Sequence, residues 1–226
     1  MNQLSTKSLI AVNLIVAFVV IFQKWGYYSV LLIYWVEAMI IGLYGLGRMC
    51  VACWFGEPFG KRIGVKDGAS RLALSLVLGG FYILKFGGFA LGLGVLVALA
   101  PGFLADGASS QKWTEVTRGL NAVGAGVAIV AALLFISHGI SFVSNFLRRR
   151  EYKKSNVIVL LFGPYVRMIL VLVVLAAGFG VTVIFPALYR TTAFAAGIVL
   201  VKLLADAVSH ALEHHQPVSM DTHTAP

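Results

Sequence analysis

Six long apolar runs, separated by short polar or basic segments, dominate the pattern of this chain. They cover about residues 9–22, 30–54, 72–100, 120–147, 157–185 and 192–215. At about 1.5 Å per residue, a run of about 20 apolar residues crosses the hydrocarbon layer of a bilayer. The first run is short and reaches that length only by including residues 4–8 and Gln23. The pattern predicts an all-α, polytopic transmembrane helical bundle with six spans over residues 1–216, followed by a disordered cytoplasmic tail over residues 217–226.

The last apolar run carries an ionisable stripe. Lys202, Asp206, His210 and Glu213 recur at intervals of four, four and three residues, which places them on one face of a helix. Charged groups inside a membrane are costly, so such a stripe is expected to face protein, water or an ion.

The second and third runs also contain charges. Tyr34, Glu37, Tyr44 and Arg48 fall near one face of the second helix, and Glu37 lies deep enough to need a partner or a proton. Lys85 stands near the middle of the third run, where it either pairs with Glu37 or extends the same polar column. The nearby Gly-x-x-x-Gly at residues 88–92 is typical of close approach to a neighbouring helix.

The fourth and fifth runs add a second polar stripe near one membrane surface. His138, Ser141 and Asn145 share a face of the fourth helix. Pro164 is expected to kink the fifth helix, and Arg167 follows one turn later. Helix rise places His138, Arg167 and the polar stripe of the last helix at overlapping depths.

Charge sets the orientation. Of the 18 lysines and arginines, eleven fall on one side if the N-terminus is cytoplasmic, four fall on the other side, and three lie within spans. This positive-inside distribution predicts a multi-pass inner (plasma) membrane protein with both termini in the cytoplasm. The net charge of +9 therefore indicates contact with the lipid bilayer and not with nucleic acid. A homo-oligomer and a partner in a membrane complex both remain open.

Cys50 and Cys53 form a single C-x-x-C. The functional interpretation is a redox pair or half of a metal site. The simpler interpretation is two small apolar residues in the last turn of a span.

Three hypotheses compete for the polar residues, and the first is a metal site. His138, Asp206 and His210 are the candidate ligands for Zn²⁺ or Fe²⁺, with Glu37 or a water as a fourth. Nearby lysine and arginine side chains oppose a cation, and the H-E-x-x-H signature is absent.

The second hypothesis is a proton or ion path, because the residue types match those of intramembrane relays. The column would consist of Glu37, Lys85, His138, Lys202, Asp206 and His210. The third is a structural or partner-binding membrane subunit, whose polar groups only lock helix packing. In every case the surrounding polar cluster comprises Glu37, Asn145, Arg167 and Lys202.

The segments YWVE at residues 34–37, SHGISF at residues 137–142 and the spaced Lys202, Asp206 and His210 resemble an uncharacterised family of bacterial polytopic membrane proteins, known as a domain of unknown function. The resemblance covers the second to the sixth run. It implies a shared six-helix body with a polar centre and no particular reaction. No G-x-S-x-G accompanies His138 and no phosphate-binding G-x-x-x-x-G-K-[ST] loop is present, so whether the protein is an enzyme stays open.

Overall fold

The computed structural model describes residues 3–56, 67–104, 110–153, 155, 157–185, 187–188 and 191–214, with side chains from residue 11 to residue 204, with gaps. The predicted tail, residues 217–226, lies outside the described residues. This part of the chain is all-helical. Its elements are α1 (Gln3–Phe22), α2 (Tyr27–Phe55), α4 (Gly68–Tyr82), the π-helical turn η1 (Ile83–Gly87), α5 (Gly88–Leu104), α6 (Ser110–Ser141), the π-helical turn η2 (Phe142–Leu147), the 3-10 turn η3 (Glu151–Lys153), α7 (Val157–Ile184) and α8 (Thr192–His214).

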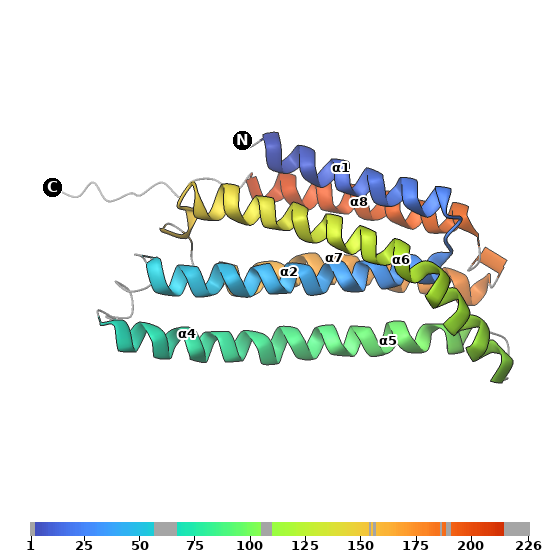
Figure 1. Ribbon diagram of the computed structural model, residues 1–226, viewed down its shortest axis with the longest axis horizontal. Helices are drawn as coiled ribbons and strands as arrows, with labels where there is room; N and C mark the ends of the chain where they lie inside the picture. The colour runs from blue at the N-terminus through green and yellow to red at the C-terminus, as the bar shows by residue number, and fades with distance from the viewer. Residues whose placement is uncertain are drawn as a thin grey trace.

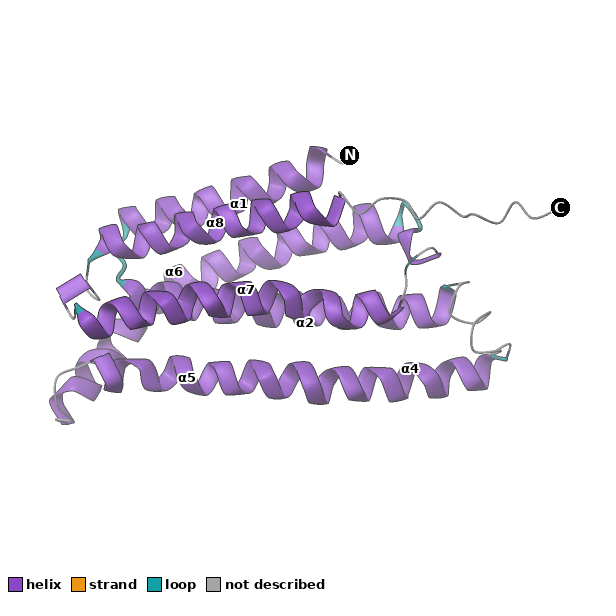
Figure 2. Cartoon of the chain, turned by 180° about the vertical axis from the view of Figure 1, so that it is seen from behind, coloured by secondary structure: helices purple, strands orange, loops and turns teal. Residues whose placement is uncertain are grey.

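The helices form a long bundle in which α2 is central (Figure 1). Helices α1 and α8 lie side by side along one edge, and the continuous rod α4–η1–α5 forms the opposite edge (Figure 2). Helix α2 contacts α4, α5, α6, α7 and α8. Half of the residues in the most apolar stretch of α2 are buried. The corresponding share is 28% in the third span, which is the rod α4–η1–α5. The sequence had drawn attention to the last helix, whereas the second helix holds the bundle together.

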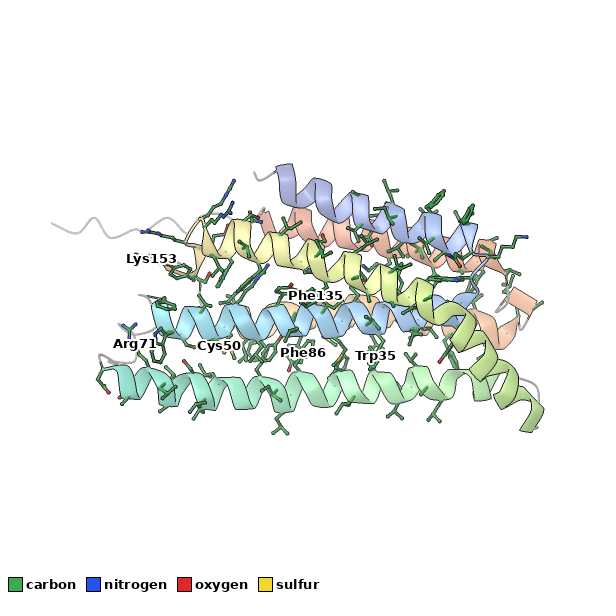
Figure 3. All side chains as sticks on the ribbon, viewed as in Figure 1. Trp35, Cys50, Arg71, Phe86, Phe135 and Lys153 are labelled. Atoms are coloured by element: carbon green, nitrogen blue, oxygen red, sulfur yellow. The ribbon has the colours of Figure 1, made fainter. Side chains whose placement is uncertain are left out.

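The two ends of the bundle differ in charge. At one end, hereafter the basic end, α2 stops at Phe55, α4 begins at Gly68, and Arg71 and Lys153 lie close to the helix termini (Figure 3). Helix α1 begins and α8 finishes toward this same end (Figure 1). At the opposite end, α1 stops at Phe22 and α2 and α8 begin.

Local chemistry explains two boundaries at the basic end. The carboxylate of Asp67 accepts a hydrogen bond from the Ser70 N–H at 2.9 Å and so caps α4. That bond favours the ionised carboxyl and lowers the pKa of Asp67. Helix α2 ends at Gly56, whose N–H donates to the Ala52 oxygen at 2.8 Å. A Cβ at Gly56 would lie 2.3 Å from that oxygen, so only glycine fits the turn.

Aromatic side chains join the third span to α2. The Tyr82 hydroxyl donates to the Gly42 carbonyl at 3.0 Å, and the Phe86 ring lies against Gly42, where a Cβ would meet it at 1.9 Å. Nearer the opposite end, the Trp35 indole donates to the Ala90 carbonyl at 2.8 Å across the same layer (Figure 3). The two spans therefore approach closely because α2 has glycines opposite large rings.

Two sequence expectations need correction. Gly88 and Gly92 do not face a neighbouring helix within the described chain, since a Cβ at either would meet nothing within 4 Å. Gly94 takes that role, against the Trp35 ring. The fourth helix begins at Ser110, about ten residues before the predicted start of the span. The reason is physical, because hydropathy marks where lipid begins, whereas a helix continues into water.

The outer surface of the bundle is strongly apolar. Side chains such as Leu84 (74% exposed), Val77 (68%) and Leu204 (66%) point away from the protein. Soluble proteins rarely expose continuous apolar surface of this kind. In the described part of the chain, three helical stretches, Tyr27–Phe55, Gly68–Leu99 and Gly124–Leu147, are long and apolar enough to cross a membrane, and Ala11–Phe22 and Thr192–Leu204 are shorter apolar helices. The molecule is therefore built as a membrane protein.

Candidate functional site

Three helices from distant parts of the chain bring one polar residue each to the same depth. Glu37 lies ten residues after the start of α2, Lys202 ten residues after the start of α8, and Asn13 nine residues before the end of α1. At about 1.5 Å per residue, all three lie about 14–15 Å from the opposite end of the bundle, near the middle of a ~30 Å apolar layer. We call these three residues the central cluster.

Lys202 and Glu37 form an ion pair. The lysine Nζ donates to both carboxylate oxygens of Glu37, at 2.7 Å and 2.8 Å, and also to Asn13 Oδ1 at 3.3 Å. The same ammonium lies 5.0 Å from the centre of the Tyr34 ring, within the range of a cation–π interaction. One cation is thus held by an anion, an amide oxygen and an aromatic face.

The central cluster is enclosed by protein. Lys202 is 1% exposed, Asn13 2% and Glu37 5%. Separating two buried opposite charges leaves each without compensation in a medium of low polarity, which is costly. The pair consequently ties α8 to α2, and Asn13 adds α1 to the same contact.

The cluster is sealed on one side by apolar residues. One turn closer to the opposite end, Val16 of α1, Ile33 of α2 and Val199 of α8 are each 3% exposed or less and belong to one core cluster. One turn closer to the basic end, α8 carries Asp206 and then His210. The polar stripe of α8 thus runs from the central cluster toward the basic end only.

His138 lies in a separate polar region, between α6 and α2. Its ring stacks near Tyr44 with 6.3 Å between ring centres, and the Tyr44 hydroxyl donates to the Phe135 carbonyl at 3.1 Å. Asn145, in the π-helical turn η2, donates to the Ser141 hydroxyl at the end of α6 at 3.4 Å. Tyr44 follows Glu37 by seven residues, so this region is about 10 Å closer to the basic end than the central cluster.

The side chains of Asp206, His210 and Arg167 lie outside the described residues, and only their backbone positions in α8 and α7 are given. The predicted metal site of His138, Asp206 and His210 therefore stays a prediction. Among the side chains that the structure does describe, no three His, Cys, Asp or Glu residues gather closely enough to hold a metal ion. Cys50 and Cys53 both lie in α2 as free thiols, half-buried and buried respectively.

The suggested pairing of Glu37 with Lys85 is wrong. Glu37 is paired with Lys202, and Lys85 is exposed on the outer side of the third span, with its Nζ 5.9 Å from the centre of the Phe81 ring. Residue counting along the helices places several charged residues at similar depths in the membrane. It does not give the direction in which each side chain points from its helix.

Sequence reasoning missed Asn13. Its signal was visible, because it is a single amide within the apolar run of residues 9–22. An amide inside a span usually hydrogen-bonds to another helix. Attention to charged residues alone passed over it.

A family model described as "Family of unknown function (DUF6498)" matches residues 2–223, nearly the whole chain. The chain belongs to this family. No curated protein and no solved structure matches it. Membership is consistent with the resemblance seen in the sequence and assigns no reaction, so the function has to be argued from the central cluster.

Proposed function

We propose that this protein is a six-span inner-membrane protein with both termini in the cytoplasm. In this proposal the central cluster is the mid-membrane part of a proton relay. The basic end would face the cytoplasm, because lysine and arginine loops are retained on that side. It holds the described residues Arg71, Arg148, Arg149, Arg150 and Lys153.

The observation that carries the proposal is the enclosed Lys202–Glu37 pair, from which the ionisable residues of α8 continue toward the basic end only. Intramembrane pairs of this kind are typical of proton and ion pathways. While the ion pair is formed, apolar packing by Val16, Ile33 and Val199 separates it from the opposite end. Asp206 and His210 follow Lys202 along α8 toward the basic end, and an imidazole exchanges protons near neutral pH.

In this mechanism a proton passes from water at the basic end through His210 and Asp206 to the Glu37 carboxylate. Protonation removes the negative charge that holds Lys202, while the ammonium keeps its contacts with Asn13 and the Tyr34 ring. Helix α8 then loses its electrostatic tie to α2, so proton binding is coupled to a shift between the two helices. This shift opens the apolar packing of Val16, Ile33 and Val199, and the proton leaves Glu37 toward the opposite end. Its loss restores the ion pair and the original packing.

The geometry favours this relay over the metal site. Both oxygens of Glu37 are occupied by Lys202 at 2.7 Å and 2.8 Å, so Glu37 is not a ready fourth ligand for Zn²⁺ or Fe²⁺. The adjacent ammonium also repels a cation. Elemental analysis of purified protein distinguishes the two hypotheses. Stoichiometric metal in the wild type that is lost in both His138→Ala and His210→Ala would refute the relay and support a metal centre.

The relay is tested by proton flux into proteoliposomes under an imposed membrane potential. Wild-type protein is expected to conduct, whereas Glu37→Gln and Asp206→Asn are expected to lose most of the flux. Tyr44→Phe is the matched control, since it removes a hydroxyl between α2 and α6 outside the relay. Absence of flux in the wild type, or equal flux in all four proteins, would refute the proposal.

A double variant separates conduction from packing. Glu37→Leu with Lys202→Leu removes both charges, and replacing a buried ion pair by apolar residues often leaves stability unchanged or improved. If the pair only locks the helices, a folded double variant keeps whatever flux the wild type has. The relay requires the folded double variant to be inactive.

A further inference from the structure

The third span carries a charge on its outer surface at mid-depth. Lys85 lies 17 residues after Gly68 and 14 residues before Leu99, the limits of the apolar stretch. At about 1.5 Å per residue, these limits are about 25 Å and 21 Å away. A lysine near a helix end snorkels to the membrane surface, but a lysine at this depth does not reach it.

The described residues of the chain offer Lys85 little compensation. Its Nζ lies over the Phe81 ring at 5.9 Å, and the side chains of Ile83 (58% exposed) and Leu84 (74%) beside it point outward. Within the described residues, Lys85 makes no hydrogen bond and no ion pair. Glu37 is already engaged by Lys202. Acyl chains provide no counter-charge, so the ammonium requires a partner from outside this chain.

The surface around Lys85 is shaped for another helix. Gly88 and Gly92, three and seven residues after Lys85, are exposed, and a Cβ added at either meets nothing within 4 Å. The inward glycines of the same layer, Gly42 and Gly94, are filled by aromatic rings from the facing helix. The outward glycines serve no packing within the described chain, and they leave room for a foreign backbone to come close to Lys85.

We propose that the face of α4–η1–α5 around Lys85 binds a transmembrane helix of a different polypeptide, one that carries an aspartate or glutamate at mid-membrane. Charge complementarity selects this occupant. A second copy related by two-fold symmetry would bring Lys85 toward Lys85, and like charges repel. Anionic lipid headgroups stay at the membrane surface, more than a lysine's length away.

The test uses a defined probe, a Leu/Ala-rich transmembrane peptide with one central Glu, and the same peptide with Gln in its place. Association with the full-length protein is measured by resonance energy transfer in phosphatidylethanolamine–phosphatidylglycerol vesicles. The Glu peptide is expected to bind about 5- to 30-fold more tightly than the Gln peptide, the range for polar contacts between model membrane helices. Lys85→Leu should abolish the preference without unfolding, because the side chain is exposed.

Two further variants define the surface. Lys85→Glu is expected to reverse the preference toward a peptide with a central Lys. Gly88→Leu is expected to weaken binding of the Glu peptide while leaving the fold intact, because its Cβ position is open. Equal binding of the two peptides, an unchanged preference in Lys85→Leu, or a Leu84→Cys disulfide between two copies of the protein in vesicles would overturn the proposal.

Discussion

Two lysines lie deep within helices of this bundle, and their surroundings are opposite. Lys202 of α8 is 1% exposed and is bound by Glu37 and Asn13. Lys85 of η1 is exposed and lies over one aromatic ring. The difference follows from the positions of the helices. Helix α8 is flanked by α1, α2 and α7, whereas the third span forms an edge of the bundle next to α2 (Figure 2).

A charged residue within a span therefore indicates a polar contact. It does not show whether the partner lies in the same chain or in another protein. Lys202 is satisfied within its own chain, where it stabilises helix packing and, in the proposed relay, responds to protonation of Glu37. Lys85 is not compensated in this way and directs attention to another protein. Variants of the two lysines should consequently affect different measurements, stability and conduction for one and association for the other.

The largest effect is expected for Lys202→Met against Lys85→Met. Removing Lys202 leaves the Glu37 carboxylate buried without its counter-charge, and loss of one member of a buried pair costs about 3–5 kcal/mol. Lys85→Met changes an exposed side chain and should alter stability by no more than about 0.5 kcal/mol. Denaturant unfolding in detergent measures the free energy of unfolding of both variants. Similar losses of stability would contradict the proposed difference between the two lysines.

Much of the fold was predictable from the sequence, for reasons that particular residues show. Each of the six apolar runs corresponds to a helix or helical rod of the structure, and the second run, about residues 30–54, lies within α2. The start of α6 was missed because its first turns are polar. Hydropathy therefore predicts the presence of a helix better than its ends.

The candidate site was predictable only in part. Glu37 and Lys202 stood out as charges in apolar runs, yet their pairing depends on which helices become neighbours and how each is rotated. Residue counts along one helix give neither the neighbours of that helix nor its rotation about its own axis. Depth arithmetic even suggested Lys85 as a partner for Glu37, because depth says nothing about the facing direction. Tertiary packing around α2 supplied the missing information.

Glycines sharpen the contrast between inward and outward faces of the third span. Gly94→Leu places a side chain against the Trp35 ring, which lies 2.8 Å from the new Cβ position, and overpacking of this kind costs about 1–3 kcal/mol. Gly88→Leu fills open space and should be neutral or slightly stabilising, since leucine favours a helix. Thermal unfolding of the two variants in the same detergent checks this, and a destabilised Gly88→Leu would mean that the outer face is already occupied within the chain.

A smaller effect is expected at Asn13. Asn13→Leu removes the amide oxygen that accepts from Lys202 at 3.3 Å and leaves the ion pair intact. Polar contacts between membrane helices are worth about 0.6 kcal/mol on average and at most about 2 kcal/mol. Unfolding measurements on Asn13→Leu, Lys202→Met and the double variant give the coupling between the two sites. A loss as large as that of Lys202→Met would make the amide, and not the carboxylate, the main partner of the lysine.

The smallest effect concerns the start of the helix that leads to Lys85. Its cap, Asp67, has a lowered pKa because the Ser70 N–H stabilises the carboxylate. A carboxyl whose pKa is lower in the folded state stabilises at pH values above its unfolded pKa of about 3.9, and this contribution disappears as the pH falls through the lower folded value. Amide exchange at Ser70 should therefore lose protection on acidification from pH ~5 toward pH ~3. Asp67→Asn, which retains a capping oxygen, should show no such step. The same step is expected in the variant with Glu37→Leu and Lys202→Leu, because the cap of α4 and the central cluster lie in different parts of the bundle; a step that vanished with the ion pair would show that the two lysine regions are coupled.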